Sequence, residues 1–366
     1  MDMYVYDEAR VPIGITSRAT AVQFETKYRE RGTFSVTFPL DEQTVDFMQR
    51  EHILVFDRAS GIAGVIMKIS QDTKSDGSEI VTVGGNLIEE YLYRRIVNPP
   101  INRTAQSVQI VSQMITQNLT APTNTDRKMN GIVIGTPVNI TDASIPFQNS
   151  YGVVGEQIEG ICITQNYGYR MRFDVGSTNM VFTLYKGTDR TTRQSIVPPA
   201  VFSQDFENIL TSKYAYNSMD YKTYGLIAGE GEGADRQLTS IGGGTGNNRR
   251  EVYIDARDLQ RENEDGTIMP LADYLKLLVL RGEERMSEMV EVENFSCDIN
   301  TNGNLEFGVD YFLGDTVTLI DSRLGITVHA QLLALTHKYD QHDLTLSCTF
   351  GFEMAGIDKK LRRALR

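Results

Sequence analysis

An internal repeat constrains the fold of this 366-residue chain more than any other feature of its sequence. The stretch from Leu54 to Gly85 reappears without gaps between Thr318 and Thr349. At this constant offset Asp57, Gly61, Ile62, Lys74 and Asp76 coincide with Asp321, Gly325, Ile326, Lys338 and Asp340. Each copy predicts a strand, an Asp-x-x-x-Gly turn, a second strand, a polar hairpin and a third strand. Two distant copies of one small β unit indicate internal pseudo-symmetry. Such symmetry is more typical of a component of an assembly than of a protein built around a single active site.

The sequence around the first copy is also rich in strand patterns. Apolar and polar residues alternate over 20–40 on both sides of Arg31-Gly32, which predicts a hairpin ending at Pro39. Asp41 is placed to cap a short helix after it. Further strands are expected over 53–56, 62–69 and 79–83, so the first hundred residues are predicted to be mostly β.

The middle of the chain changes to helical periodicity. Val108, Val111, Ile115 and Leu119 share one helical face, and a second helix is expected after Gly152. A hairpin turning at 176–177 follows, and the proline pair at 198–199 marks a boundary. This segment is predicted to be α+β.

The region after the proline pair combines strands, a glycine-rich loop and a helix. Strands are expected over 210–228 and 251–256, with 229–248 between them as the most flexible segment of the chain. A helix with Pro270 in its first turn is predicted to end at Gly282. Asn302-Gly303 then predicts a type I′ hairpin whose second strand contains Leu305, Phe307 and Val309.

Charge and the N-terminal sequence exclude several classes of protein. The chain has 36 Lys and Arg against 48 Asp and Glu, a net charge of −12, whereas a general nucleic-acid binder needs a basic surface for phosphate contacts. The acidic start lacks the apolar core of a signal peptide, and the longest apolar run, near 275–280, is too short to span a bilayer. We therefore expect a protein that folds in a cytoplasm and does not insert into a membrane.

The glycine cluster Gly229, Glu230, Gly231, Glu232 and Gly233 follows an apolar strand, as a nucleotide-binding loop would. Its two glutamates would repel a phosphate, because a phosphate cradle needs backbone N–H donors free of negative charge. The later cluster at 242–246 lacks the Gly-Lys-Ser/Thr of a P-loop. Both clusters are predicted to lie in a mobile surface loop, and 229–233 is a candidate assembly element.

The histidines and cysteines form no recognisable site. His329, His337 and His342 fall on different strand faces or across a predicted turn, which does not suit metal ligation. The three cysteines are widely spaced among apolar residues, as expected for reduced core thiols. No Gly-x-Ser-x-Gly or His-Glu-x-x-His motif occurs. We predict a protein that is not an enzyme and that binds no metal or cofactor.

The C-terminal segment 359–366 concentrates positive charge in Lys359, Lys360, Arg362, Arg363 and Arg366, which are further candidate assembly residues. One interpretation is a solvated, frayed terminus. The other is a segment that docks on an acidic neighbour, since the rest of the chain is acidic.

Several motifs together resemble those of phage tail-hub proteins. They are the segment 34–40 (FSVTFPL), the strand after Asp57, the segments 83–87 (VGGNL) and 91–96 (YLYRRI) with a Pro-Pro pair, and 229–233 (GEGEG). Over nearly its whole length the chain is similar to the siphophage and prophage baseplate-hub family, which shares the T4-type hub fold.

This resemblance implies a mainly β fold with α+β insertions, in which two tail-tube-like β-barrel domains accompany smaller α+β domains. The expected division is 1–100 for the first tube-like barrel, 101–200 for an α+β domain, 201–290 for an α+β region with the flexible loop 229–248, 291–358 for the second tube-like barrel unit, and 359–366 for the basic tail.

The resemblance also implies a homotrimer whose repeated units form a pseudo-sixfold ring at the virion tail tip, assembled in the cytoplasm of a bacterial host. The expected partners are a distal tail protein ring or the tail tube, a tape-measure protein, and tail fibre or receptor-binding proteins. DNA would pass through the acidic lumen without specific binding.

Two other functions stay open on the sequence alone. A receptor-binding or carbohydrate-binding tail-tip protein would also be β-rich, although the chain has no Trp, the residue most used to stack on sugars. A cell-wall hydrolase would need positioned carboxylates in a cleft, which spacing alone does not reveal.

Overall fold

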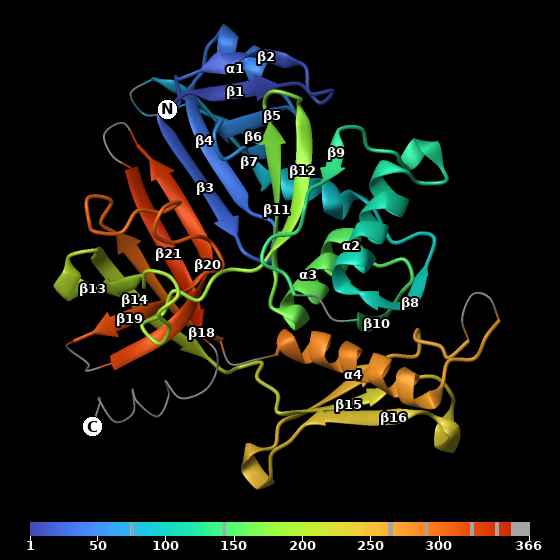
Figure 1. Cartoon of the computed structure of the whole chain (residues 1–366). Coiled ribbons are helices and arrows are strands. Elements are labelled where there is room, and N and C mark those ends of the chain that lie inside the picture. Colours follow the sequence, from blue (N-terminus) through green and yellow to red (C-terminus); the bar gives the residue numbers. More distant parts are fainter. Residues whose placement is uncertain are drawn as a thin grey trace.

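The computed structural model describes residues 1–352 apart from 74, 76, 142–143, 263–265, 290–291, 323–325 and 341–343. Its largest element is a 13-stranded sheet, and three smaller sheets accompany it. Figure 1 shows the two halves of the large sheet meeting at an angle, with a helix-rich part beside the first half and a small sheet covered by one long helix beyond it. The prediction of a mainly β fold with α+β insertions is confirmed.

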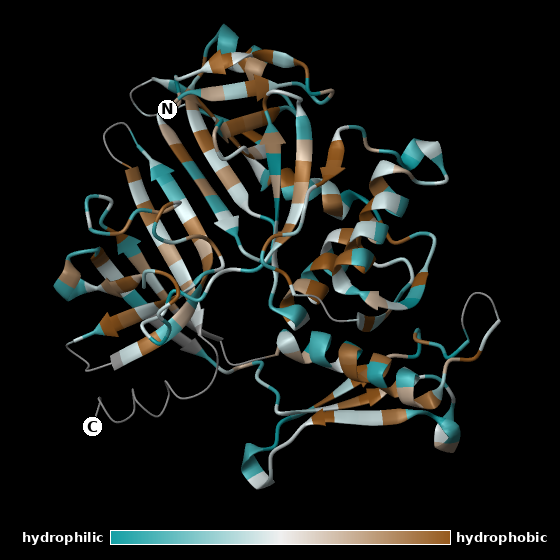
Figure 2. Cartoon of the chain, viewed as in Figure 1, coloured by the Kyte–Doolittle hydropathy of each residue, from teal (hydrophilic) through white to brown (hydrophobic). Residues whose placement is uncertain are grey.

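The first β unit is the N-terminal half of the large sheet and contains the first copy of the repeat. Its elements are β1 (Met3–Tyr6), β2 (Pro12–Thr16), β3 (Ala21–Lys27), β4 (Thr33–Pro39), α1 (Glu42–Phe47), β5 (Ile53–Asp57), β6 (Ile62–Thr73) and β7 (Glu79–Leu87). Buried and exposed residues alternate along β3 and β4, and Figure 2 shows hydrophobic and hydrophilic residues alternating along the large sheet. Asp41 caps α1 as predicted, since its carboxylate accepts a hydrogen bond from the Thr44 N–H at 2.8 Å.

The Asp-x-x-x-Gly turn of the first copy forms as predicted. The Asp57 carboxylate accepts hydrogen bonds from the backbone N–H groups of Ala59 at 2.9 Å and Ser60 at 3.1 Å. Gly61 N–H donates to the Asp57 carbonyl at 2.8 Å, and Gly61 has φ +70°, a conformation that favours glycine. The equivalent Gly325 lies outside the described residues.

The second β unit repeats the first. Its strands are β13 (Val201–Ser203), β14 (Ile209–Asn217), β18 (Val292–Ile299), β19 (Thr316–Asp321), β20 (Ile326–Tyr339) and β21 (Leu344–Phe352). They lie in the order β14-β18-β21-β20-β19-β13, which matches β3-β4-β7-β6-β5-β1 strand for strand in chain order. The repeat read from the sequence is therefore a structural repeat. One strand departs from it, because β13 runs parallel to β19 whereas β1 is antiparallel to β5.

Strand β3 joins the two units into one sheet. Residues 22–27 of β3 pair antiparallel with residues 334–339 of β20, while residues 326–331 of β20 pair with β19. Tyr28, directly after β3, donates its N–H to the Leu333 carbonyl at 2.8 Å, and its own carbonyl accepts from the Tyr169 N–H at 3.1 Å. Its buried hydroxyl accepts from the Gly187 N–H at 3.2 Å. Tyr28 thus ties both β units to the middle of the chain.

The middle of the chain forms an α+β part that packs on β5 and β6. Its elements are the 3₁₀ helix Ile88–Arg94, β8 (Ile101–Gln106), α2 (Ser107–Ile115) with the π turn Thr116–Thr120, the 3₁₀ helix Thr125–Arg127, β9 (Ile132–Ile134), β10 (Ser144–Asn149), α3 (Val154–Gln165), β11 (Gly168–Asp174) and β12 (Asn179–Tyr185). The two predicted helices are α2 and α3, and the hairpin predicted at 176–177 joins β11 to β12. One continuous cluster of buried side chains unites them with Ile53, Val55 and Val65 of the first β unit.

A small separate core lies between β14 and β18 in the chain. It comprises β15 (Tyr224–Ala228), β16 (Leu238–Gly242), β17 (Glu251–Asp255) and α4 (Leu271–Ser287), with the 3₁₀ helices Gly233–Asp235 and Gly246–Asn248. The glycine-rich sequence predicts a loop throughout 229–248, but β16 lies inside this segment and pairs antiparallel with β15. The strand has only five residues, its two apolar residues do not alternate with polar ones, and glycines follow it closely.

The predicted hairpin at Asn302-Gly303 is wrong in its second half. A turn does form there, with Gly303 N–H donating to the Asn300 carbonyl at 2.9 Å. The segment 305–309 forms an isolated bridge from Phe307 to Tyr311 and no strand. The aromatic rings of these two residues lie 5.5 Å apart, so this apolar run packs as an irregular segment against the core of the second β unit.

Candidate assembly elements

The Gly229–Gly233 segment leaves the end of β15 and turns into β16. Gly229 N–H donates to the Gln237 carbonyl at 2.8 Å, and Gln237 N–H donates to the Glu230 carbonyl at 2.9 Å. Gly231 and Gly233 have φ values of +95° and +55°, which residues with side chains rarely adopt. The segment is therefore a shaped turn at the end of a hairpin, with its outer residues exposed to solvent.

The inner side of this turn is fixed to α4. The buried Tyr274 hydroxyl accepts from the Glu230 N–H at 2.8 Å and donates to the Leu259 carbonyl at 2.9 Å. A Cβ atom on Gly229 would lie 2.3 Å from the Tyr274 hydroxyl oxygen, so only glycine fits there. Because the N–H groups of Gly229 and Glu230 already donate within the chain, they are unavailable to cradle a phosphate.

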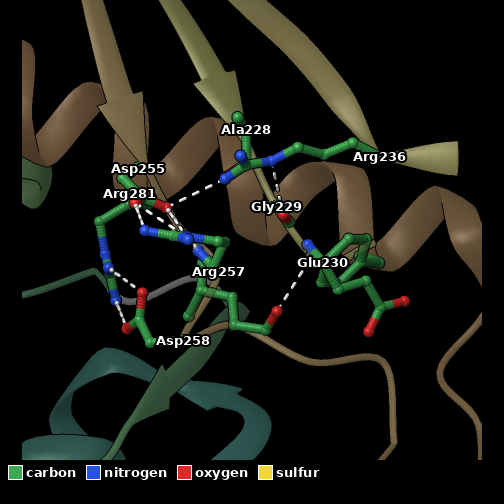
Figure 3. A network of polar contacts seen from close by, with 10 residues as sticks. Ala228, Gly229, Glu230, Arg236, Asp255, Arg257, Asp258 and Arg281 are labelled. Carbon is green, nitrogen blue, oxygen red and sulfur yellow. Dashed lines mark hydrogen bonds and ion pairs between the residues drawn. The ribbon is translucent and has the colours of Figure 1, made fainter. Parts of the chain in front are cut away.

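A charged network borders the same turn (Figure 3). The Arg236 guanidinium donates to the Gly229 carbonyl at 3.2 Å and to the Asp255 carboxylate at 3.1 Å. Arg257 donates to both oxygens of Asp255, at distances from 2.6 to 3.0 Å. These hydrogen bonds from Arg257 lower the pKa of Asp255. The pairs are exposed, so they orient the end of the hairpin more than they stabilise it.

A second ion pair in Figure 3 connects α4 to the segment after β17. Arg281 donates to both oxygens of Asp258 at 3.0 Å each. One turn further along α4, Glu284 packs on α3, where a Cβ on Gly160 would lie 2.8 Å from its carboxylate. Burial raises the pKa of Glu284. Helix α4 thus covers the small sheet on one side and contacts α3 on the other, which fixes the small core to the α+β part.

Two edges of the large sheet are also candidates for assembly, and sequence reasoning missed them. Within the described residues, β14 pairs only with β18, and residues 68–73 of β6 pair only with β7. Large apolar side chains are exposed on both strands, with 44% of Ile69 and 61% of Leu210 accessible. An unpaired strand edge is a template for pairing with another chain. Only the sheet order reveals which edges are left open.

The remaining candidates of the sequence analysis lie apart from these elements. His337 is buried and stacks on Phe24 with ring centroids 4.5 Å apart, whereas His329 Nδ1 lies 3.1 Å from the Thr318 hydroxyl. His342 and the basic segment 359–366 lie outside the described residues. Across the described part of the chain, no group of three or more His, Cys, Asp and Glu residues is arranged to hold a metal. No helix in that part combines the length and apolar character needed to cross a bilayer.

Comparison with known proteins gives a family and a fold. The model of the Siphovirus ReqiPepy6 Gp37-like protein family matches residues 2–352. No curated protein matches the sequence. Among solved structures, the tail protein from Neisseria meningitidis MC58 is similar with a TM-score of 0.57, 11% identity and coverage of 96% of both chains.

Two prophage proteins also have a similar fold. The 43 kDa tail protein of prophage MuSo2 from Shewanella oneidensis has a TM-score of 0.56 at 12% identity, covering 96% of this chain and 97% of its own. Prophage tail protein gp18 from Listeria monocytogenes EGD-e has a TM-score of 0.53 at 13% identity, covering 100% and 98%. The resemblance to phage tail proteins that the sequence motifs indicated is thereby confirmed.

Proposed function

Because this chain belongs to the family of Siphovirus ReqiPepy6 Gp37-like proteins, we propose that it is a structural hub protein of a phage tail. In this proposal three copies form a pseudo-sixfold ring that joins the tail tube or a distal tail protein ring to the tail tip. The chain acts by assembly and not by catalysis. The observation that carries the proposal is the way the two β units already join within one chain.

The pairing of the two β units within one chain suggests how neighbouring chains would pair in a ring. It places β3 of the first unit beside the outer half of β20 in the second unit. By the strand correspondence, β14 is the counterpart of β3, and β6 is the counterpart of β20. Both counterparts have one open edge in the described residues. Pairing β14 of one chain with residues 68–73 of β6 in the next would repeat the join between chains.

Repetition of one join closes a ring. Each chain contributes two units and one internal join, so three chains give six units with alternating internal and external joins. Closed rotational symmetry of this kind pairs both of these edges in every chain, whereas an unclosed series would form a filament. The exposed apolar side chains of β6 and β14 would become buried in the process, which favours association.

The ring would serve as a passage for DNA at the virion tail tip. A net charge of −12 gives the chain an overall repulsion for phosphate, so DNA would move past without stopping. Assembly would take place in the host cytoplasm, with the tape-measure protein inside the tail and tail fibre or receptor-binding proteins outside it. The exposed turn at 229–233 and the basic segment 359–366 are the parts that we assign to such neighbours.

The experiment is a measurement of mass in solution by light scattering, followed by negative-stain averages of the same sample. A particle of about three times the 41.1 kDa chain mass, with six lobes around a hole, is the expected result. Where the protein alone is monomeric, the measurement is repeated with the purified tail-tube protein. A monomer that forms no ring under either condition contradicts the proposal.

A matched pair of variants tests the strand edges themselves. Ile69→Asp places a charge on the open half of β6. It is expected to lower the association constant of the trimer by roughly tenfold or more, because burying a charge at an apolar contact is costly. Val133→Asp, on β9, is the control, since Val133 is 43% accessible and Ile69 is 44%. Equal trimer formation by both variants would exclude this edge from the interface.

A further inference from the structure

A cavity of about 620 Å³ lies where the first β unit, the α+β part and the second β unit meet. Its wall includes the end of β3, the start of β6, residues 170–172 of β11, the connection 186–190 and the segment 307–315 of the second unit. It is therefore built from segments that are far apart in the sequence. Its volume falls within the range typical of ligand sites.

The cavity wall carries an excess of positive charge in an acidic protein. Of its five cationic residues, Lys27 pairs with Glu30 at 2.9 Å and Arg190 pairs with Asp315 at 2.8 Å. The other three, Arg170, Arg172 and Lys186, form no ion pair within the described residues. Arg170 rests on the Tyr185 ring at 4.8 Å, and its buried Nε has no hydrogen-bond partner in that part of the chain.

A buried carboxyl group lines the same cavity, and one of its two oxygens has no hydrogen-bond partner in the described residues. Glu89 is only 8% exposed and lines the cavity. Its Oε1 accepts from the Met171 N–H at 3.0 Å, but its buried Oε2 has no partner in the described residues. Burial raises the pKa of Glu89 to about 7, so near neutral pH this oxygen is protonated in a large fraction of molecules and can donate a hydrogen bond.

Large apolar side chains also line the cavity, and they add a second requirement for the ligand. Leu87 and Leu313 contribute aliphatic surface, and Phe307 and Phe312 contribute aromatic surface. Val138 and Phe312 remain 41% and 40% exposed, although both line the cavity. A small inorganic ion would leave this apolar surface in contact with water. A ligand with an apolar body beside its anionic group would cover it.

We propose that this cavity binds a carboxylate group carried on an apolar body, with Arg170, Arg172 and Lys186 facing the carboxylate and the apolar wall facing the body. Guanidinium groups bind carboxylates through paired N–H donors, and a protonated Glu89 would donate one more hydrogen bond. A phosphate dianion fits less well, because its second charge would oppose the ionised fraction of Glu89. The carboxylate could belong to a free small molecule or to an acidic segment of a neighbouring tail protein.

Isothermal titration calorimetry on the full chain distinguishes these sources. The probes are hexanoate, hexylammonium, inorganic phosphate, and the peptide acetyl-Ala-Leu-Phe-Asp-amide with its Asn counterpart. Binding of hexanoate without the peptide supports a small molecule, and binding of the acidic peptide in preference to its Asn counterpart supports a protein segment. Binding of phosphate alone, equal binding of hexylammonium, or no binding at millimolar concentrations overturns the proposal.

Variants locate the binding in the cavity. Arg172→Met is expected to lower the affinity for the bound probe by about tenfold or more, because a charge-assisted contact is lost. Arg193→Met is the control, since Arg193 is also exposed, is not part of the cavity wall and forms no ion pair within the described residues. Lys186→Met, in an exposed connection, provides a second test if Arg172→Met folds poorly. Unchanged affinity in both cavity variants overturns the site, and none of these outcomes depends on ring formation.

Discussion

Phe24 of β3 lies directly opposite His337 of β20, and their rings stack with centroids 4.5 Å apart at the join between the two β units. His337 is 9% exposed, and its Nδ1 has no hydrogen-bond partner within the described residues. Burial lowers the pKa of His337 to about 4, although the nearby Asp57 acts in the opposite direction. The join is therefore made by a neutral histidine that behaves as an aromatic core residue.

Acid is expected to weaken this join through His337. A histidine whose pKa is lower in the folded state than in the unfolded state contributes stability above pH 6.5, and this stability is lost as the pH falls from 6.5 to about 4. The loss is about 3 kcal/mol. His337→Phe keeps a stacking ring without the charge, so its free energy of unfolding should fall less on acidification. Urea titrations of both proteins at pH 7 and pH 4 provide the measurement, and parallel losses would contradict the prediction.

Glu89 is expected to produce the opposite pH dependence. Its pKa is raised to about 7 by burial, so the folded chain keeps a proton that the unfolded chain releases from about pH 4.5 upward. Stability is highest below that range and decreases by about 3 kcal/mol as the pH rises through 7. Glu89→Gln retains an oxygen for the Met171 N–H and does not ionise. Between pH 5 and 8 the free energy of unfolding of this variant should depend less on pH than that of the native chain. An unchanged pH dependence would rule out burial of the charge.

The close approach of the hairpin turn to α4 predicts unequal effects for two glycines. Gly229→Ala would place a methyl group 2.3 Å from the Tyr274 hydroxyl oxygen and 2.9 Å from Leu278, and should lower the free energy of unfolding by about 2 kcal/mol. Gly243→Ala is the matched control, because a Cβ there meets no atom within 4 Å and its cost should stay below about 0.5 kcal/mol. Thermal unfolding of both variants provides the comparison. Equal melting temperatures would show that the turn shifts to accommodate the methyl group.

The Tyr28 hydroxyl is expected to stabilise the junction of three parts of the chain. Tyr28→Phe leaves the Gly187 N–H without the acceptor that lies 3.2 Å away in the native chain, at an expected cost of about 1–2 kcal/mol. Tyr151→Phe serves as the control, since Tyr151 is 62% exposed. Chemical denaturation compares the two. A loss no larger than that of the control would mean that water replaces the missing hydroxyl.

The strand repeat could be predicted from sequence because it depends on local patterns. Alternating apolar residues, the Asp57 turn and the Asp41 cap each lie within a few residues of the groups they contact. The predictions that failed depended on competition with tertiary contacts. The run 305–309 has a strand pattern, yet it packs irregularly beside Tyr311, and β16 forms inside a glycine-rich segment because β15 offers it a partner.

Site prediction was limited in the same way. The sequence drew attention to Gly229–Gly233 as a glycine cluster, but the contact of Gly229 with Tyr274 that explains its first glycine joins residues far apart in the chain. In the sequence, Glu89 is only one of two adjacent acidic residues. Nothing local shows that its carboxyl group is buried beside Met171 and that Arg170 and Arg172 line the same cavity.

The sequence by itself determined most strands of the two β units, their duplication and the acidic balance of the chain, because these follow from residue type and short-range spacing. Tertiary structure alone decided which edges stay open and where charges gather. Pairing of β3 with β20 uses one edge of each unit and leaves one edge of β14 and one edge of the outer half of β6 open in the described residues. Packing of the two β units and the α+β part around one cavity sets the environment of Glu89, since burial depends on all the atoms around a group and not only on its neighbours in the chain.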